Sequence, residues 1–234
     1  MAPNTIYEDG DYLENNPTWH AEDSPWKARQ ITKILNSNNI LPTTICEIGC
    51  GTGEILNCLA KEKAFDEVQF SGYDISPQAI EISRQKQQPR LQFFQEDFLQ
   101  KTGISFDVVM AIDVIEHVED NFTFLRKLKN KGTYKIFHIP LDLSVNTVLR
   151  GAPLLYRRHK VGHIHYFTKD TALALLKDTG YEVVSYFYTN SASELPNITL
   201  NGTLMKLPRK LLFSLNPDLA VRVLGGFSLL VLTK

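Results

Sequence analysis

Apolar residues follow two alternating patterns along this chain. Short, nearly continuous apolar runs are followed by stretches in which apolar residues recur at helical spacing. Continuous runs are typical of strands covered on both faces, as in a parallel sheet. The pattern predicts strands at residues 45–48, 68–73, 91–94, 106–112, 134–140, 183–188 and 227–232. It predicts helices at residues 24–36, 54–63, 122–129 and 169–177, and a further helix that begins at residue 77. This alternation predicts an α/β fold.

The first strand leads into a glycine-rich turn, and the turn leads into a helix. The stretch reads TTICEIGCGTGEILNCL over residues 43–59. Glycines at alternate positions let the backbone turn sharply and approach a ligand, which then lies against the amides that begin the helix. A dinucleotide fingerprint needs a third glycine where the chain has Glu54, and a phosphate-binding loop needs a Gly-Lys-Ser/Thr sequence that is missing here. The spacing therefore indicates a different nucleotide-like cofactor.

Polar residues follow two further strands, at the edge where an open parallel sheet places its ligand crevice. Asp74 ends the second strand, 21 positions after Gly53. A carboxylate at this place can accept hydrogen bonds from both hydroxyls of a ribose. The alternative is that Asp74 acts only as the N-cap of the next helix. Residues 113–117 follow the central strand and are expected to border the reacting group.

The length and charge of the chain limit its domain number and its partners. We expect residues 1–234 to form a single domain, with a leading segment and helix at 1–37 and insertions at 141–167 and 190–225. The formal net charge of -1 gives no overall field that would attract nucleic acid or an anionic membrane. The sequence therefore predicts neither partner, and it leaves the oligomeric state open.

The cysteines and the chain ends give no sign of a metal site or of export. Cys46, Cys50 and Cys58 lack the paired C-x2-C units of a zinc site, so we expect free thiols and no metal. The first residues lack the basic region and apolar core of a secretory signal, and the apolar segment 211–232 is interrupted by polar residues. A cytoplasmic protein is expected.

The stretch from Glu47 to Gly53 reads Glu-x-Gly-x-Gly-x-Gly, without a departure from the pattern that it resembles. That pattern is the first motif of the class I S-adenosylmethionine-dependent methyltransferases. The sequence EHV at 116–118 and the pattern Gly-His-x-x-x-Phe-Thr at 162–168 resemble the small-molecule and quinone O-methyltransferase branch. The resemblance implies a doubly wound, mostly parallel, Rossmann-like sheet of seven strands in the order 3-2-1-4-5-7-6, with the last strand antiparallel.

The resemblance also implies that S-adenosyl-L-methionine is the cofactor, and it assigns roles to residues. In the family an aspartate at the place of Asp97 accepts from the adenine amino group, while the next amide, here that of Phe98, reaches the ring. The cofactor-binding residues expected on this basis are Glu47, Gly49, Cys50, Gly51, Gly53, Asp74, Ile75, Asp97, Phe98 and Asp113.

Methyl transfer from a sulfonium is an in-line displacement, so the protein mainly aligns an activated carbon with a nucleophile. A general base adds to the rate when that nucleophile is a hydroxyl, and histidine has a suitable pKa. His117 and His163 are the predicted catalytic residues, with His138 and His165 as further candidates at the same edge. The alternative for His117 is that it packs and hydrogen-bonds within its loop.

The predicted acceptor is a small molecule, with a hydroxyl oxygen as the methylated atom. Arg157, Arg158 and Lys160 form a basic cluster that either recognises an anionic acceptor or belongs to a solvated turn. An RNA methyltransferase is a weaker alternative, because no basic appendage is present. A nicotinamide-dependent enzyme or a non-catalytic nucleotide-binding protein is the remaining alternative, and the missing third glycine argues against nicotinamide.

The acceptor side of the site is expected to be covered by a lid. The insertions at 141–167 and 190–225 are expected to form this lid. Residues 141–167 and the leading segment both attach to the sheet edge that carries the crevice, the first after the fifth strand and the second before the first strand. We expect residues 141–167 to face the aromatic leading segment, represented by Tyr12, Trp19 and His20, across the reacting methyl group.

Overall fold

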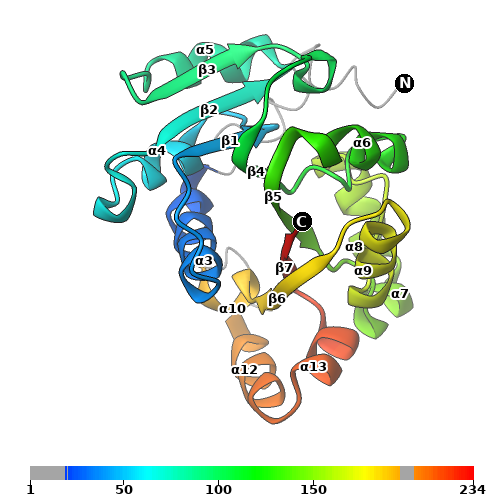
Figure 1. Cartoon of the computed structure of the whole chain (residues 1–234). Coiled ribbons are helices and arrows are strands. Elements are labelled where there is room, and N and C mark those ends of the chain that lie inside the picture. Colours follow the sequence, from blue (N-terminus) through cyan, green and yellow to red (C-terminus); the bar gives the residue numbers. More distant parts are fainter. Residues whose placement is uncertain (1–18, 20, 196–202) are drawn as a thin grey trace.

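The computed structural model describes residues 19, 21–195 and 203–234, which contain a seven-stranded sheet of order β3-β2-β1-β4-β5-β7-β6 (Figure 1). β7 pairs antiparallel with both β5 and β6, and the other pairings are parallel. The predicted strand order and the antiparallel last strand are confirmed. The strands are β1 (Thr44–Ile48), β2 (Gln69–Asp74), β3 (Leu91–Gln95), β4 (Phe106–Ile112), β5 (Gly132–Pro140), β6 (Val183–Thr189) and β7 (Ser228–Thr233).

Helices cover both faces of the sheet and create two hydrophobic cores. One core contains residues of α3 (Ser24–Ser37), α4 (Glu54–Leu59) and α5 (Pro77–Arg84), and the other contains residues of α6 (Asn121–Leu128) and α9 (Lys169–Asp178). Neighbouring residues of one strand enter opposite cores: Ile45 joins the first and Cys46 the second. This double coverage explains the continuous apolar runs in the sequence.

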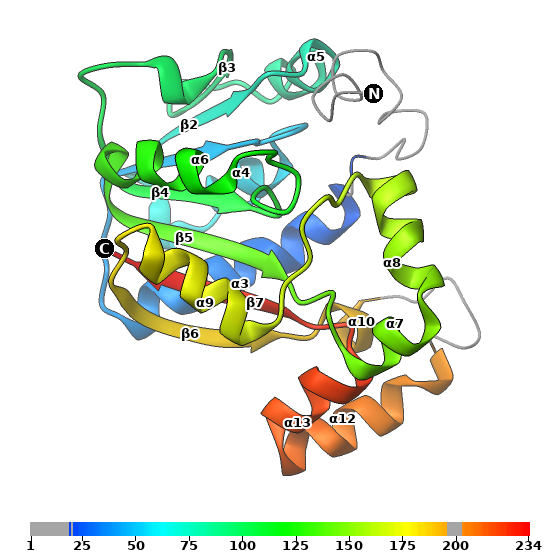
Figure 2. The same cartoon turned by 90° about the vertical axis from the view of Figure 1, so that its right-hand side faces the viewer.

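The two insertions form short helices beyond the end of the sheet toward which the β5 arrow points (Figure 2). The side-chain amide of Asn146 donates a hydrogen bond to the Leu224 carbonyl over 3.3 Å, which joins the first insertion to the second. No helix in the described part of the chain is long and apolar enough to cross a membrane. The insertion helices are α7 (Val145–Arg150), α8 (Ala152–Tyr156), a π-helical turn (Arg157–Val161), α10 (Ser191–Glu194), α12 (Lys206–Leu215) and α13 (Pro217–Leu224).

One predicted helix end differs clearly from the structure. α4 ends at Leu59, before the expected residue 63, because the chain turns there into a 3-10 helix that buries Phe65. α3 begins at Ser24, as the sequence predicted, and Ser24 is buried. Asp23 holds the cap position without a side-chain hydrogen bond to the helix.

The glycine turn between β1 and α4 depends on glycine for two reasons. Gly49, Gly51 and Gly53 have φ values of +66°, +52° and +74°, a region that other residues rarely adopt. A Cβ on Gly49 would lie 2.8 Å from Cγ2 of Val114, and one on Gly53 would overlap the Phe93 ring. The turn therefore combines a left-handed backbone with close packing.

The destabilisation caused by a steric clash at Gly53 can be separated from that caused by its left-handed backbone. Gly103 has a φ of +73°, nearly that of Gly53, but a Cβ there would meet nothing within 4 Å. We expect Gly103→Ala to lower the free energy of unfolding by about 1–2 kcal/mol, the cost of left-handed backbone. Gly53→Ala should lower it by a further ~1–3 kcal/mol because of the clash with Phe93. Equilibrium urea unfolding measures both values, and equal losses would contradict the steric contribution.

Candidate active site

A cavity of about 780 Å³ opens at the carboxyl ends of the parallel strands. Its volume lies in the range of sites for small molecules and cofactors. It is lined by the two predicted catalytic histidines and by every predicted cofactor-binding residue except Gly53, which packs against Phe93 instead. The predicted residues that line it are Glu47, Gly49, Cys50, Gly51, Asp74, Ile75, Asp97, Phe98, Asp113, His117 and His163.

Asp74 holds the glycine turn against the end of β2. Its Oδ2 accepts a hydrogen bond from the Gly51 amide and its Oδ1 one from the Ser76 amide, each over 2.8 Å. Burial raises the pKa of Asp74, and these amides oppose the rise. The N-cap of α5 is Ser76, whose hydroxyl accepts from the Ala79 amide, so Asp74 is not the cap of that helix.

Glu47 is a buried carboxyl group at the base of the turn. Burial raises its pKa to about 8; Lys27 opposes the rise, and Asp74 and Asp113 add to it. Its Oε2 has no hydrogen-bond partner among the described residues, although Glu47 lines the cavity. A buried acceptor without a partner is costly, so this atom suits a ligand that carries N–H donors.

Asp113 connects the leading helix to the middle of the sheet. Its Oδ2 lies 2.8 Å from Nζ of Lys27 in α3, and its Oδ1 lies 2.6 Å from Nδ1 of His138 in β5. Nε2 of His138 lies 2.9 Å from the Thr189 hydroxyl, at the end of β6. Burial alone would raise the pKa of Asp113, but His138 and Lys27 hold it well below its ordinary value. The sequence did not indicate the part played by Lys27.

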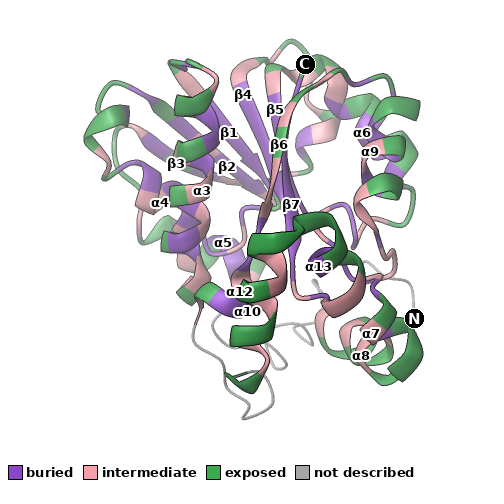
Figure 3. Ribbon diagram, turned by 90° about the horizontal axis from the view of Figure 1, so that it is seen from below, coloured by how far each residue is buried: buried purple, intermediate pink, exposed green. Residues whose placement is uncertain are grey.

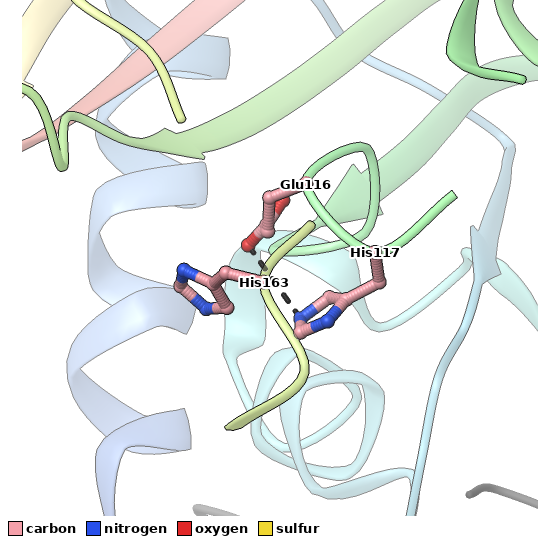
Figure 4. Close-up of side chains that lie close together, drawn as sticks. All are labelled: Glu116, His117 and His163. Carbon is pink, nitrogen blue, oxygen red and sulfur yellow. Dashed lines mark ion pairs between the residues drawn. The ribbon is translucent and has the colours of Figure 1, made fainter. Parts of the chain in front are cut away.

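A second polar cluster forms where the loop after β4 meets the segment after the π-helical turn. Glu116, His117 and His163 lie close together there, and Nε2 of His117 is 3.8 Å from Oε1 of Glu116 (Figure 4). The amides of Ile164 and His165 donate to the Glu116 carbonyl over 2.9 and 3.0 Å, which holds the two segments together. The sequence indicated the two histidines as catalytic candidates but gave no sign of a role for Glu116.

Both histidines of this cluster are oriented through Nδ1. Nδ1 of His117 lies 3.0 Å from the Gly162 carbonyl oxygen, and Nδ1 of His163 lies 2.6 Å from Oδ2 of Asp142. Arg157 contacts the other oxygen of Asp142 over 2.9 Å. Because a carbonyl or a carboxylate can only accept, Nδ1 is the donor in each neutral ring and Nε2 carries the lone pair. Orientation of this kind is typical of histidines that bind metals or accept protons.

Burial determines the protonation of the cluster. Glu116 is fully buried, which raises its pKa well above the ordinary value, and Asp113 and Asp142 add to the rise. Neither of its carboxyl oxygens has a hydrogen-bond partner in the described part of the chain. Burial also lowers the pKa of His117 to about 4, with a further contribution from His163, so this ring is neutral at pH 7.

The cluster has the composition of a metal site. One ligand atom from each of the three residues lies within 4.8 Å of the others. One carboxylate and two imidazoles form a donor set that binds divalent transition metals. The structure thus brings possible ligands together at a place where the sequence predicted no metal.

The remaining predicted residues lie around this site or outside the described chain. Trp19 lines the cavity, and a Cβ on Gly51 would lie 3.6 Å from its Cε3. Tyr12 and His20 fall outside the described residues. His165 is not part of the cluster, since its Nε2 lies 2.9 Å from the Val118 carbonyl oxygen.

Asp97 is exposed and accepts from the Leu99 amide. Of the basic cluster, Arg157 lines the cavity, whereas Arg158 and Lys160 are exposed and do not line it.

Comparisons with known proteins agree with this geometry. Residues 19–186 match a family described as a methyltransferase domain. The human tRNA N(3)-cytidine methyltransferase METTL6 is 26% identical over 229 residues, covering 85% of this chain and 79% of that protein. Ajmaline N-methyltransferase of Rauvolfia serpentina is 31% identical over 94 residues, but the match covers only 37% of this chain and 31% of that enzyme.

A solved structure shows the same fold. Magnesium protoporphyrin IX methyltransferase from Synechocystis PCC 6803, with S-adenosylhomocysteine bound, matches with a TM-score of 0.60 and 17% identity. The match covers 89% of this chain and 82% of that one. The family match, the sheet order and the cavity at the glycine turn agree, and the chain belongs to the S-adenosylmethionine-dependent methyltransferase family.

Proposed function

We propose that this methyltransferase methylates a hydroxyl oxygen of a small molecule, and that Glu116, His117 and His163 promote the loss of the hydroxyl proton. The observation that carries this proposal is the buried cluster itself. Two of its members, His117 and His163, line the same cavity as the glycine turn. An acceptor in that cavity can therefore approach both the cluster and the cofactor.

We assign the cofactor to the end of the cavity formed by β1 and β2. S-adenosylmethionine supplies an activated methyl carbon when it is bound. We assign the ribose to Gly51 and Asp74, and the adenine to Asp97 and Phe98, all of which line the cavity. The Oε2 of Glu47 suits the cationic amino group of the methionine part, because this buried acceptor has no partner among the described residues.

The acceptor hydroxyl needs more than a simple histidine base. A general base works best when its pKa lies near the working pH, and that of His117 is lowered to about 4. The close approach of one ligand atom from each of Glu116, His117 and His163, within 4.8 Å of one another, instead favours a bound divalent cation. Glu116, His117 and His163 would hold such a cation, which would lower the pKa of an acceptor hydroxyl bound to it, and the hydroxyl proton would pass to solvent.

A tRNA acceptor is the second candidate, because METTL6, named as a tRNA methyltransferase, matches 85% of this chain. The cavity supports the small-molecule proposal, since Arg157, its basic residue near the insertion, is already paired with Asp142. We accordingly propose an uncharged acceptor group. The expectation that nucleic acid is excluded has no support from the comparisons.

Transfer of a radiolabelled methyl group identifies the class of acceptor molecule. Incubation of a cell extract with the protein and radiolabelled S-adenosylmethionine should place label in the organic-soluble fraction. Purified total tRNA should remain unlabelled under the same conditions, and a Glu47→Gln variant is the control for background transfer. Label in tRNA, with none in the organic-soluble fraction, would replace the small-molecule proposal by the tRNA candidate.

Asp74 should contribute directly to cofactor affinity. Asp74→Ala removes an acceptor for the ribose hydroxyls, and hydrogen bonds to charged groups contribute about 1.5–3 kcal/mol each, so affinity for S-adenosylhomocysteine should fall at least about tenfold. Calorimetry gives the dissociation constants. Asp107→Ala is the matched control, because Asp107 also accepts from two backbone amides, Thr43 and Thr44, but lies outside the cavity lining. If the two variants bound S-adenosylhomocysteine with equal affinity, Asp74 would have only the structural role of holding the glycine turn.

The cluster should bind a divalent cation without any acceptor present. Mn²⁺ titrated into the protein and followed by electron paramagnetic resonance should show a bound population. Glu116→Gln, nearly the same in shape, should weaken binding by at least about tenfold because it removes the charged ligand. Glu119→Gln changes an exposed carboxylate close by in sequence and should leave binding unchanged. Absence of bound Mn²⁺ in the unaltered protein would leave the cluster as a histidine base alone.

A further inference from the structure

The two insertions expose an unusual number of apolar side chains. Fifteen large apolar side chains are exposed in the described part of the chain, and ten of them lie in residues 145–156 and 204–219. Figure 3 shows exposed ribbon on α7, α8 and α12, which surround one end of the molecule. The ten residues are Val145, Val148, Leu149, Leu155, Tyr156, Leu204, Leu207, Leu211, Leu215 and Leu219.

In α12 the exposed apolar residues form a stripe of their own. Phe213, on the inner side, stacks on Phe227 with ring centroids 5.2 Å apart, so the helix already has a buried face. Leu207, Leu211 and Leu215 recur at intervals of four on the outer side and are 75%, 61% and 76% exposed. A helix that faced water on this side would carry polar residues there.

The first insertion shows the same arrangement. Val145, Val148 and Leu149 of α7 lie on one helix face by their spacing, and Leu149 is 81% exposed. Leu155 and Tyr156 continue the exposed apolar surface on α8. α13 of the second insertion packs against both α12 and α7, and Asn146 of α7 donates a hydrogen bond to its Leu224 carbonyl.

Basic residues outnumber acidic residues around these apolar side chains. Residues 145–161 and 203–219 together contain seven Lys and Arg residues and one acidic residue, Asp218, which pairs with Lys169, in a chain whose net charge is -1. The overall charge therefore hides a local excess of basic residues. The basic residues that are exposed are Arg150, Arg158, Lys160 and Lys210.

We propose that these exposed side chains of residues 145–161 and 203–215, here called the basic apolar face, bind the surface of an anionic lipid bilayer. Leucines beside lysines and arginines match the boundary between acyl chains and anionic headgroups. A nucleic acid would match the basic residues but would leave the leucine stripe without an apolar partner. This proposal goes against the expectation from overall charge, because the net value hides the local excess of basic residues.

The basic apolar face is continuous with the active site. Arg157 and Val161 of the π-helical turn line the cavity, and the same turn carries exposed Arg158 and Lys160. A bilayer bound to this face would therefore lie beside the acceptor end of the cavity. Binding to lipid does not require the proposed hydroxyl chemistry and can be tested separately.

Flotation with vesicles tests the proposal on the full chain. The protein should float with phosphatidylcholine vesicles that contain phosphatidylserine and should remain unbound with phosphatidylcholine alone. High salt should weaken binding, because the attraction to headgroups is partly electrostatic. Failure to float with the anionic vesicles would overturn the proposal, and equal flotation with both compositions would overturn its electrostatic part.

Paired variants locate the surface. Leu211→Gln combined with Leu149→Gln should lower the partition coefficient by about tenfold or more, since each removes apolar area from the interface. Arg158→Gln combined with Lys210→Gln should lower it by a similar factor. The controls are Leu41→Gln, at a leucine that is 89% exposed ahead of β1, and Lys61→Gln, at an exposed lysine after α4.

The controls should bind vesicles as the unaltered protein does. Calorimetric binding of S-adenosylhomocysteine checks that all variants are folded. An equal loss in the control variants would overturn the assignment to this face. Binding of tRNA that depends on the same leucines and basic residues, without binding to vesicles, would overturn the lipid partner in favour of RNA.

Discussion

The contact between Lys27 and Asp113 is the interaction on which most of the site depends. It joins α3 to the end of β4, and His138 and Thr189 extend it across β5 to β6. Buried charges are costly unless every partner is in place, so this network fixes the elements that it connects. Asp113 also has a φ of +54°, which non-glycine residues rarely adopt, and these contacts hold it in that conformation.

The three buried carboxyl groups around this contact differ in their partners. Burial raises the pKa of Glu47 and Glu116, whereas Asp113 has a lowered pKa despite its burial because His138 and Lys27 contact it. Glu47 and Asp113 line the cavity, and Glu116 is buried next to His117, which lines it too. A structural ion pair thus occupies the middle of the cavity, and Oε2 of Glu47 remains as a buried acceptor for a ligand.

The sequence predicted those features whose signals are local. The apolar runs of β1 and β4, the glycine spacing and the acid at the end of β2 depend on neighbours within a few residues, and the structure confirms the fold that they predict. Pairing between distant side chains has no such signal: nothing near Lys27 indicates Asp113, and nothing near Glu116 indicates His163. The exposed faces of the insertion helices have no sequence signal for a different reason. Apolar residues at helical spacing normally indicate a buried face, whereas those of the insertions point to solvent.

The position of β7 between β5 and β6 has a consequence for how the chain assembles during synthesis. Strands β1 to β5 pair with one another and can form a sheet as soon as they leave the ribosome. β6 is made next but pairs only with β7, so it has no partner until β7 has also emerged. During that interval β5 ends the sheet as an open apolar edge, which is the kind of edge on which chains aggregate. The late strand thus delays the completion of the sheet until β7 has emerged, and until then the unpaired edge is the same one, that of β5.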